Sequence, residues 1–300
     1  MKTGLSITCW NALSLVGLII VIISCSSTPN VGAISTVTPV KTIVPRPDHV
    51  VIVMEENHDF SEIIGSSSAP YINALASLGA SLTDSHAVTH PSEPNYLALF
   101  AGSTFGLSDD SCPNTFTSAN LAQELIHAHG TFGGYSEDLP SVGYTGCSSS
   151  NYARKHNPWV NFTNVPSSVN MPLTKFPTNP ANYRLLPTIS IVIPNLQDDM
   201  HDGTVGQGDT WLQSHINSYV TWAKTHRSLL IVTWDEDDNS NANQIPTIFV
   251  GPMVKAGKYG ENVSHYNVLR TLESMYGLAP VGSSAKAAPI MDIWQAKVGV

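Results

Sequence analysis

The chain has 300 residues, of which 42% are hydrophobic and 12% are charged. This length and composition allow one sizeable core or two small ones. The formal net charge of -9 and the small number of basic residues, 14 in all, argue against nucleic acid as a partner, because binding to a phosphate backbone needs clustered Lys and Arg. An acidic chain that binds an anionic ligand needs a local positive charge, and a bound cation is the simplest source.

The N-terminal segment is typical of an export signal. Lys2 precedes a charge-free stretch whose apolar core, residues 13–23, is too short to span a bilayer, which takes about 20 residues. Ile22 to Cys25 has the form of a bacterial lipobox, in which the cysteine is lipidated. We expect a signal peptide with a lipobox at 1–25, a tether at 26–47 and a single domain at 48–300. The alternative is an ordinary cleaved signal with an incidental cysteine. Either makes the protein exported, as a lipid-anchored surface protein or a secreted one.

Apolar runs of strand length alternate with segments of helical spacing along the rest of the chain. We expect strands at 49–54, 188–193, 229–234 and 247–250, and helices at 71–78, from 95 onward, at 119–129, 211–226 and 268–276. This alternation predicts an α/β fold, with a central, mostly parallel sheet flanked by helices on both faces. The region 104–188, rich in Ser, Asn, Gly and Pro, is expected to form loops and insertions, such as a lid or a substrate platform.

Two cysteines fall within the expected mature domain, Cys112 and Cys147. An exported compartment permits a disulfide, which would close a loop of roughly 36 residues and add about 4 kcal/mol of stability. Two free thiols are the alternative that we favour less. Two cysteines are too few for a zinc site built from thiolates.

Acidic and amide side chains follow two of the expected strands directly. Glu56 and Asn57 come after the first strand, and Asp235 and Glu236 come after the strand that ends at Trp234. Ligands of parallel sheets gather at the carboxyl ends of the strands, so these oxygens are candidate ligands of a divalent cation. A solvated acidic turn is the alternative for the run 235–238. Oxygen ligands favour calcium, magnesium or manganese, with iron and zinc left open, and one or two ions could bind.

Ser92 stands just before a Pro-Asn that opens an apolar helix. A hydroxyl at that position meets the positive end of the helix dipole, which suits a phosphoryl oxygen. A helix N-cap is the more ordinary role for such a serine. As a nucleophile it would need activation, and the predicted cation could provide it.

A third polar cluster, at 194–203, mixes His201 with several carboxylates. Its histidine could position a leaving group, or the cluster could hold a second cation. Asp209, just beyond it, is as easily the N-cap of the next helix as a catalytic group. His156 and His265 are isolated in the sequence and by themselves read as ordinary surface or core histidines.

Several ordered motifs together resemble the phosphoesterase family of the alkaline phosphatase superfamily. That family contains bacterial phospholipases C and exported acid phosphatases, including phosphatidylinositol-3-phosphatase-like enzymes. The resemblance extends over residues 49–277 and is carried by the segments 54–58, 90–102, 155–158, 194–212, 233–236 and 265–266.

The resemblance implies an alkaline phosphatase-like sheet and a hydroxyl nucleophile that is phosphorylated and then hydrolysed. It places Ser92 at the nucleophile position. The other implied roles are metal binding by Glu56, Asn57, Asp235 and Glu236, catalysis by His201 and His265, and substrate binding by Asn95 and His156.

Two departures from the phospholipases favour a phosphatase. Glu236 is followed by Asp237 and Asp238 where phospholipase relatives have His-Gly, and the chain has no recognisable C-terminal lipid-binding domain. The leading interpretation is a monomeric, metal-dependent phosphomonoesterase acting on a phosphoinositide or another small phosphate ester. One alternative is a phospholipase C-type phosphodiesterase acting on phospholipid headgroups, with the lipid anchor holding it at the membrane. The other is a non-enzymatic surface lipoprotein that holds a structural cation.

Overall fold

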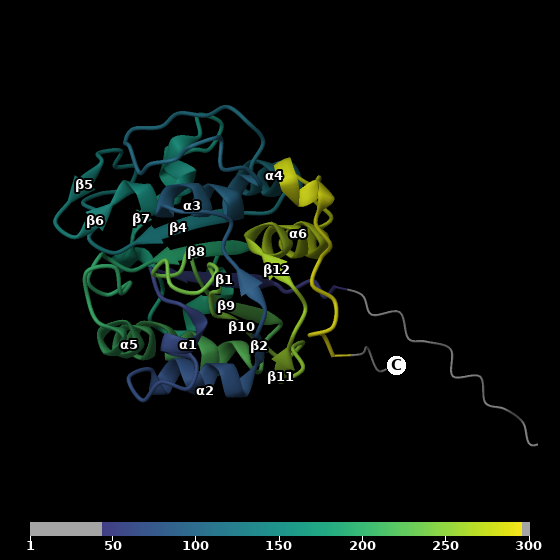
Figure 1. The fold of residues 1–300 in the computed structure, drawn as a ribbon. Coiled ribbons are helices and arrows are strands. Elements are labelled where there is room, and N and C mark those ends of the chain that lie inside the picture. Colours follow the sequence, from purple (N-terminus) through teal and green to yellow (C-terminus); the bar gives the residue numbers. More distant parts are fainter. Residues whose placement is uncertain (1–43, 296–300) are drawn as a thin grey trace, which may run out of the picture. The chain divides into compact units, whose positions relative to one another are not determined.

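The computed structural model describes residues 44–295 (Figure 1). The expected lipobox and most of the expected tether lie outside these residues, so the boundaries at 25 and 47 stay predictions. Within the described residues no helix is both long and apolar enough to cross a membrane.

The strands fall into one large sheet and two short pairs. The large sheet contains β1 (His49–Glu55), β2 (Ala80–Leu82), β4 (Phe132–Ser136), β7 (Asn170–Pro172), β8 (Ile189–Ile193), β9 (Ser228–Trp234), β10 (Thr247–Val250) and β11 (Gly257–Tyr259). The short pairs are β3 (Ser85–His86) with β12 (Val263–Ser264), and β5 (Ser148–Ser149) with β6 (Tyr152–Ala153).

The α-helices are α1 (Phe60–Ile63), α2 (Pro70–Leu78), α3 (Ser92–Ala101), α4 (Leu121–His127), α5 (Val205–Ala223) and α6 (His265–Tyr276). Short 3-10 helices lie at Arg154–His156, Pro158–Asn161, Ser167–Val169, Leu173–Lys175, Pro180–Leu185 and Gly282–Lys286.

The large sheet has the order β11-β2-β10-β9-β1-β8-β4-β7. Its neighbouring strands pair in parallel except at β10, which runs antiparallel to both β9 and β2. This confirms the mostly parallel sheet expected from the alternation of strands and helices. The carboxyl ends of β1, β4, β8 and β9 therefore share one edge.

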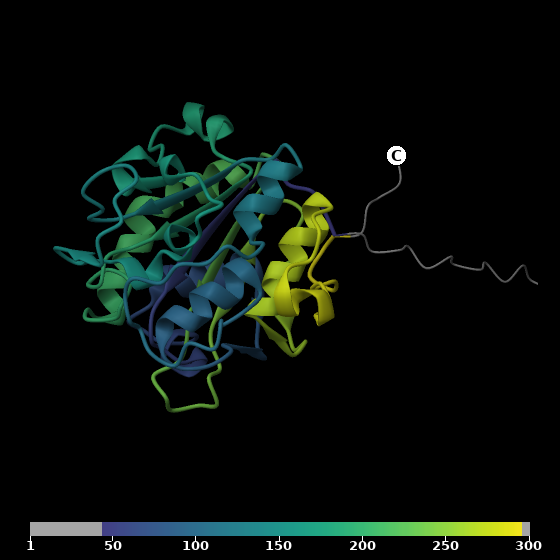
Figure 2. The same ribbon diagram turned by 90° about the horizontal axis from the view of Figure 1, so that it is seen from above.

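Helices cover both faces because the central strands are apolar on both faces. Val50, Ile52 and Met54 of β1 pack in the cluster that includes residues of α3, α4 and α6. Val51 and Val53 pack in the cluster that includes α1, α2 and α5. Figure 1 shows these two sets of helices on opposite sides of the sheet, and Figure 2 looks onto the side covered by α3, α4 and α6.

The expected strands are confirmed, and three helices begin at least three residues earlier than expected, α3 at Ser92, α5 at Val205 and α6 at His265. The expectation of loops and insertions over 104–188 is wrong for two segments, because β4 and β7 of this region are strands of the central sheet. β4 is short and contains Gly133 and Gly134, which weaken the sequence signal of a strand. Trp159 fills the space that a side chain at Gly134 would occupy.

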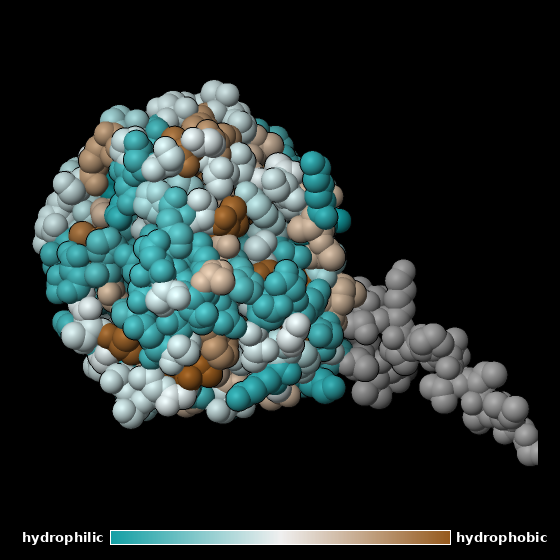
Figure 3. Space-filling model, viewed as in Figure 1, coloured by the Kyte–Doolittle hydropathy of each residue, from teal (hydrophilic) through white to brown (hydrophobic). Residues whose placement is uncertain are grey.

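The expected disulfide is confirmed. Cys112 and Cys147 are bonded, with their Cα atoms 5.8 Å apart and a separation of 35 positions in sequence. The surface drawn in Figure 3 is mainly hydrophilic, and hydrophobic residues appear on it only as small separate patches.

Candidate active site

The paired carboxyl ends of β1 and β9 bring four candidate metal ligands together. Glu55 is opposite Trp234 in this parallel pair, so the residues that follow, Glu56 and Asp235, leave the sheet at the same edge. Side chains alternate along a strand, which sends Glu55 toward the α5 side, with Val51 and Val53, and leaves Glu56 on the side of α3. Glu56 and Asp235 have no exposed surface.

Ser92 lies at the first turn of α3 and faces two of these carboxylates. Its Oγ is 3.1 Å from Glu56 Oε2 and 3.2 Å from Glu236 Oε1, and the residue is only 2% exposed. The N-cap of α3 is Pro91, and the hydroxyl of Ser92 makes no capping bond, so the N-cap interpretation of this serine is wrong. A hydroxyl carries one proton, so it can donate to only one of its two carboxylate neighbours at a time.

Tyr96 is one helical turn beyond Ser92 and points to the same carboxylate. Its hydroxyl donates to Glu56 Oε1, and its ring stacks on that of His156 with centroids 5.0 Å apart. Glu56 is thus held from two directions by residues of one helix face.

The amide of Asn57 completes an oxygen-rich group. One end of it lies 3.3 Å from Glu56 Oε2 and 3.2 Å from Glu236 Oε1. If the amide nitrogen of Asn57 faces Glu56 and Glu236, it donates a hydrogen bond to each carboxylate. If the amide oxygen faces them, it provides a further oxygen ligand for a cation. The backbone N–H of Asn57 also donates to Asp235 Oδ1 at 3.2 Å.

The site fits a divalent cation. Asp235 Oδ2 is buried and accepts no hydrogen bond from the residues that the structure describes, and Glu236 Oε2 lies 2.6 Å from His90 Nδ1. Burial and the nearby carboxylates raise the pKa of Asp235 well above its usual range, and burial and Glu56 raise the pKa of Glu236 to about 7. A cation among these oxygens would reverse both shifts, because it favours the ionised form of every carboxylate around it.

A second group shares Glu56. His156 Nε2 lies 3.0 Å from Glu56 Oε1, and His156 Nδ1 lies 3.2 Å from Asp199 Oδ2. These three buried residues lie close enough to hold an ion. Burial would lower the pKa of His156, but Glu56 and Asp199 together raise it above the ordinary value. A protonated His156 between two carboxylates and a cation in the same place are therefore the two ways to balance this charge.

Sequence reasoning missed His90 as a site residue. Its Nδ1 lies 2.6 Å from Glu236 Oε2 and its Nε2 lies 3.2 Å from Asp237 Oδ1. About a third of its side chain is exposed, so it lies between the buried carboxylates and solvent. Its position two residues before Ser92 was the only signal in the sequence.

The two expected catalytic histidines, His201 and His265, are not among the hydrogen-bond partners of the Ser92 hydroxyl. His201 is at the rim, where its Nδ1 lies 2.8 Å from Asp202 Oδ1 and its Nε2 lies 3.3 Å from Lys155 Nζ. His265 is buried, and its Nε2 lies 2.7 Å from the backbone oxygen of Asp235, to which it donates. It supports the loop that carries Asp235 and Glu236.

The side-chain amide of Asn95 forms hydrogen bonds with backbone atoms. Its oxygen accepts from the N–H groups of Val88 and Thr89, and its nitrogen donates to the oxygens of Thr89 and Pro91. It shapes the loop that carries His90. Asp209 does not cap its own helix; it accepts from two N–H groups at the start of α2.

Comparison with known proteins decides the family. The model of the Phosphoesterase family matches residues 66–279. The chain belongs to the phosphoesterase family.

Two relatives are named as phosphatases. A phosphatidylinositol-3-phosphatase of Mycobacterium tuberculosis is 56% identical over 265 residues, which cover 88% of each chain. An acid phosphatase of Aspergillus fumigatus is 31% identical over 81% of this chain and 58% of its own length. The chain is accordingly a phosphoric ester hydrolase.

The fold agrees with this family. A protein of the alkaline phosphatase superfamily from Vibrio parahaemolyticus has a TM-score of 0.56 and 12% identity, covering 81% of this chain and 71% of that one. The lipoteichoic acid synthase LtaP from Listeria monocytogenes has a TM-score of 0.56 and 9% identity, covering 79% and 74%. At these identities the likeness concerns the fold alone.

Proposed function

We propose that this phosphoesterase hydrolyses phosphate monoesters with Ser92 as nucleophile and a divalent cation held by Glu56, Asn57, Asp235 and Glu236. The observation that carries the proposal is the position of the Ser92 hydroxyl, between Glu56 and Glu236 and at the N-terminus of α3. A buried serine with two carboxylate acceptors can lose its proton locally, and the helix N-terminus favours the anionic substrate.

The reaction proceeds in two steps. Ser92 Oγ bonds to phosphorus while the ester bond breaks, and the alcohol leaves with a proton. Water then attacks the phosphoserine, which restores the hydroxyl and releases phosphate. When bound, the cation would offset the charge on the phosphoryl oxygens and lower the pKa of the attacking hydroxyl.

The chain's own residues supply proton transfer at two positions. Glu236 Oε1 lies 3.2 Å from Ser92 Oγ and can take the proton of Ser92. His90 and His201 are the histidines with partial exposure near the site, so we assign to them the proton of the leaving alcohol or of water. His265 is buried against Asp235 and acts as a positioning residue.

We propose a phosphoinositide or another small monoester as the substrate. The supporting fact is the name of the Mycobacterium relative, which is 56% identical over most of both chains. Phosphodiester cleavage of phospholipids is the second activity to test.

We also propose that the mature protein is exported and anchored through Cys25. Lipid labelling of the full chain beside Cys25→Ala tests this. Loss of the label in the variant is the expected result, and equal labelling of both would refute the anchor.

The deciding experiment measures hydrolysis of p-nitrophenyl phosphate and bis-p-nitrophenyl phosphate, with and without chelator. We expect monoesterase activity that chelator removes and that falls by at least about 10³-fold in Ser92→Ala. Ser108→Ala, at an exposed position, is the matched control and should keep full activity. Full activity of Ser92→Ala would refute the nucleophile, and activity on the diester alone would favour the phospholipase.

A further inference from the structure

Lys155 is a partly buried cation at the rim of the site. Its Nζ donates to Asp110 Oδ2 at 2.9 Å and lies 3.3 Å from His201 Nε2. Only 18% of its side chain is exposed. Sequence reasoning assigned no role to Lys155 or to Asp110.

The second oxygen of Asp110 reaches the start of α3. Asp110 Oδ1 accepts from the backbone N–H of Glu93 at 2.9 Å. Glu93 follows Ser92 in the first turn, where N–H groups have no partner within the helix and attract anions. One carboxylate therefore holds both an ammonium and a helix amide beside the proposed nucleophile.

Lys155 also belongs to the same site as Glu56. Lys155 contacts His201, and the ring centroids of His201 and His156 are 6.0 Å apart. His156 in turn lies 3.0 Å from Glu56, which accepts from Ser92. Burial alone would lower the pKa of Lys155, but Glu56, Asp110 and Asp235 more than offset this and keep it raised.

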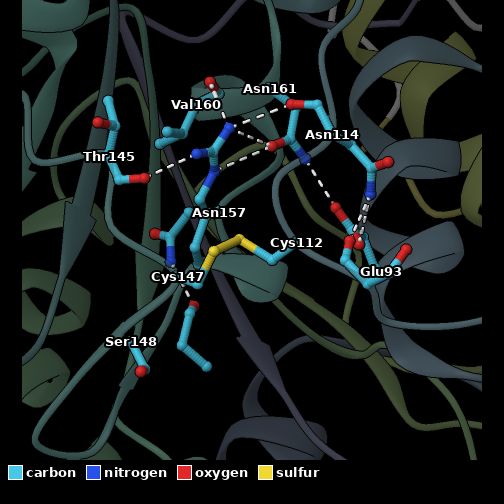
Figure 4. The surroundings of a disulfide bond; sticks show 12 residues. Glu93, Cys112, Asn114, Thr145, Cys147, Ser148, Asn157, Val160 and Asn161 are labelled. Atoms are coloured by element: carbon cyan, nitrogen blue, oxygen red, sulfur yellow. Dashed lines mark hydrogen bonds between the residues drawn. A yellow bond between two sulfur atoms is a disulfide. The ribbon is translucent and has the colours of Figure 1, made fainter.

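A disulfide and a hydrogen bond from an arginine side chain fix the loop that carries Asp110. Cys112 is bonded to Cys147, and Arg154, next to Lys155, donates to the backbone oxygens of Thr145 and Asn114 (Figure 4). The side-chain amides of Asn114 and Asn161 donate to Glu93 at 3.0 and 2.8 Å, and Figure 4 draws these bonds as dashed lines. The disulfide and this network fix Asp110 and Lys155 relative to the start of α3.

We propose that Lys155 binds a phosphoryl oxygen of the substrate and that Asp110 occupies its place in the free enzyme. The substrate exchanges with the Asp110 carboxylate for the same two donors, Lys155 Nζ and the N–H of Glu93. This rests on the proposed function, because the exchange takes place beside Ser92.

The exchange gives selectivity for monoesters. A phosphate monoester has three non-ester oxygens and two negative charges near neutral pH, whereas a diester has two such oxygens and one charge. The extra oxygen and charge of the monoester are what Lys155 would bind. Loss of the Lys155 ammonium should therefore weaken binding of the monoester more than binding of the diester.

If the ion pair between Asp110 and Lys155 were purely structural, the opposite effect would be expected for Asp110→Asn. If Asp110 and Lys155 only hold the loops together, Asp110→Asn and Lys155→Met should both impair the enzyme. If Asp110 competes with substrate, Asp110→Asn should tighten phosphate binding while Lys155→Met weakens it. The two explanations thus differ in the sign of one effect.

The test measures KM and kcat for p-nitrophenyl phosphate and bis-p-nitrophenyl phosphate, and inhibition by inorganic phosphate, with the mature, cation-loaded enzyme. In Lys155→Met we expect the monoester KM and the inhibition constant to rise by about 10–100-fold, the loss of one charge-assisted hydrogen bond. In Asp110→Asn we expect both to fall by about 3–10-fold, because a competing state is removed. Lys155→Arg should recover part of the loss.

The matched controls are Asp109→Asn, at the exposed neighbouring position, and Lys175→Met, at an exposed lysine outside the site. Both should leave KM and inhibition unchanged. Weaker phosphate binding in Asp110→Asn, or an unchanged KM in Lys155→Met, overturns the proposal. Full activity of Ser92→Ala would overturn the proposed nucleophile, and this readout is separate from the other two.

Discussion

His265 Nε2 donates to the backbone oxygen of Asp235 at 2.7 Å, so a residue at the start of α6 holds the loop that carries the candidate metal ligands. Burial lowers the pKa of His265 to about 4. A histidine whose pKa is lower in the folded than in the unfolded protein contributes stability that is complete above about pH 6.5 and is lost as the pH falls toward 4.

We therefore expect unfolding free energy to fall between pH 7 and pH 4 by up to about 3 kcal/mol through His265 alone. His265→Gln keeps a donor at a similar position but does not titrate, so it should lack this part of the pH dependence. Urea unfolding at several pH values measures it, with the exposed His127→Gln as control. Identical pH profiles for wild type and His265→Gln would contradict the assignment.

Cation removal should inactivate the enzyme, and the affinity for the cation should depend on pH. Burial and Glu56 raise the pKa of Glu236 to about 7, so below that pH protons compete with the cation. Calorimetric titration of the metal-free protein should show tighter binding, with less proton release, as the pH rises above 7.

The ligand variant Glu236→Gln should weaken cation binding by about 10–100-fold or more. Asp48→Asn, an exposed carboxylate, is the control. Unchanged binding in Glu236→Gln would remove this residue from the ligand set, and the measured stoichiometry decides between one ion and two.

Removal of the disulfide should destabilise the fold. Cys112 and Cys147 close a loop across 35 positions. In the chain-entropy model, the free energy of unfolding of the double variant Cys112→Ser/Cys147→Ser should therefore be lower by on the order of 4 kcal/mol. Reductant should lower the Tm of the wild type and leave that of the double variant unchanged. The same Tm for wild type and double variant would show that the bond contributes nothing.

Two glycine substitutions should act with opposite signs. A Cβ at Gly134 would lie 2.2 Å from Trp159, so Gly134→Ala should destabilise by about 1–3 kcal/mol through overpacking. At Gly206, in the first turn of α5, the nearest atom is 3.8 Å away, and Ala should stabilise by about 0.5–1 kcal/mol. Denaturant unfolding measures both, and equal stability of the two variants would contradict this packing.

The sequence predicts the central strands because they are buried on both faces and therefore uniformly apolar. β1 and β9 are the clearest examples. The sequence does not predict β4, because its packing partner is distant in the chain. Trp159, 25 positions later, fills the space above Gly134. A strand that depends on such a contact has no signature in its own residues.

The same distinction holds for the site. Glu56, Asn57, Asp235 and Glu236 could be grouped in advance because parallel strands end at one edge of the sheet. His90, Asp110 and Lys155 could not, because they lie on loops and a short 3-10 helix whose course depends on a disulfide, a buried arginine and the start of α3.

The position of β1 in the middle of the sheet constrains how the chain can fold. Its two neighbours, β8 and β9, lie at 189–193 and 228–234, so almost all of the sheet forms between distant segments. Such contacts form slowly, because long loops must close before any strand pairing is gained. A ribosome that has made the first 180 residues has produced no partner for β1, and the chain stays open until most of its length is available.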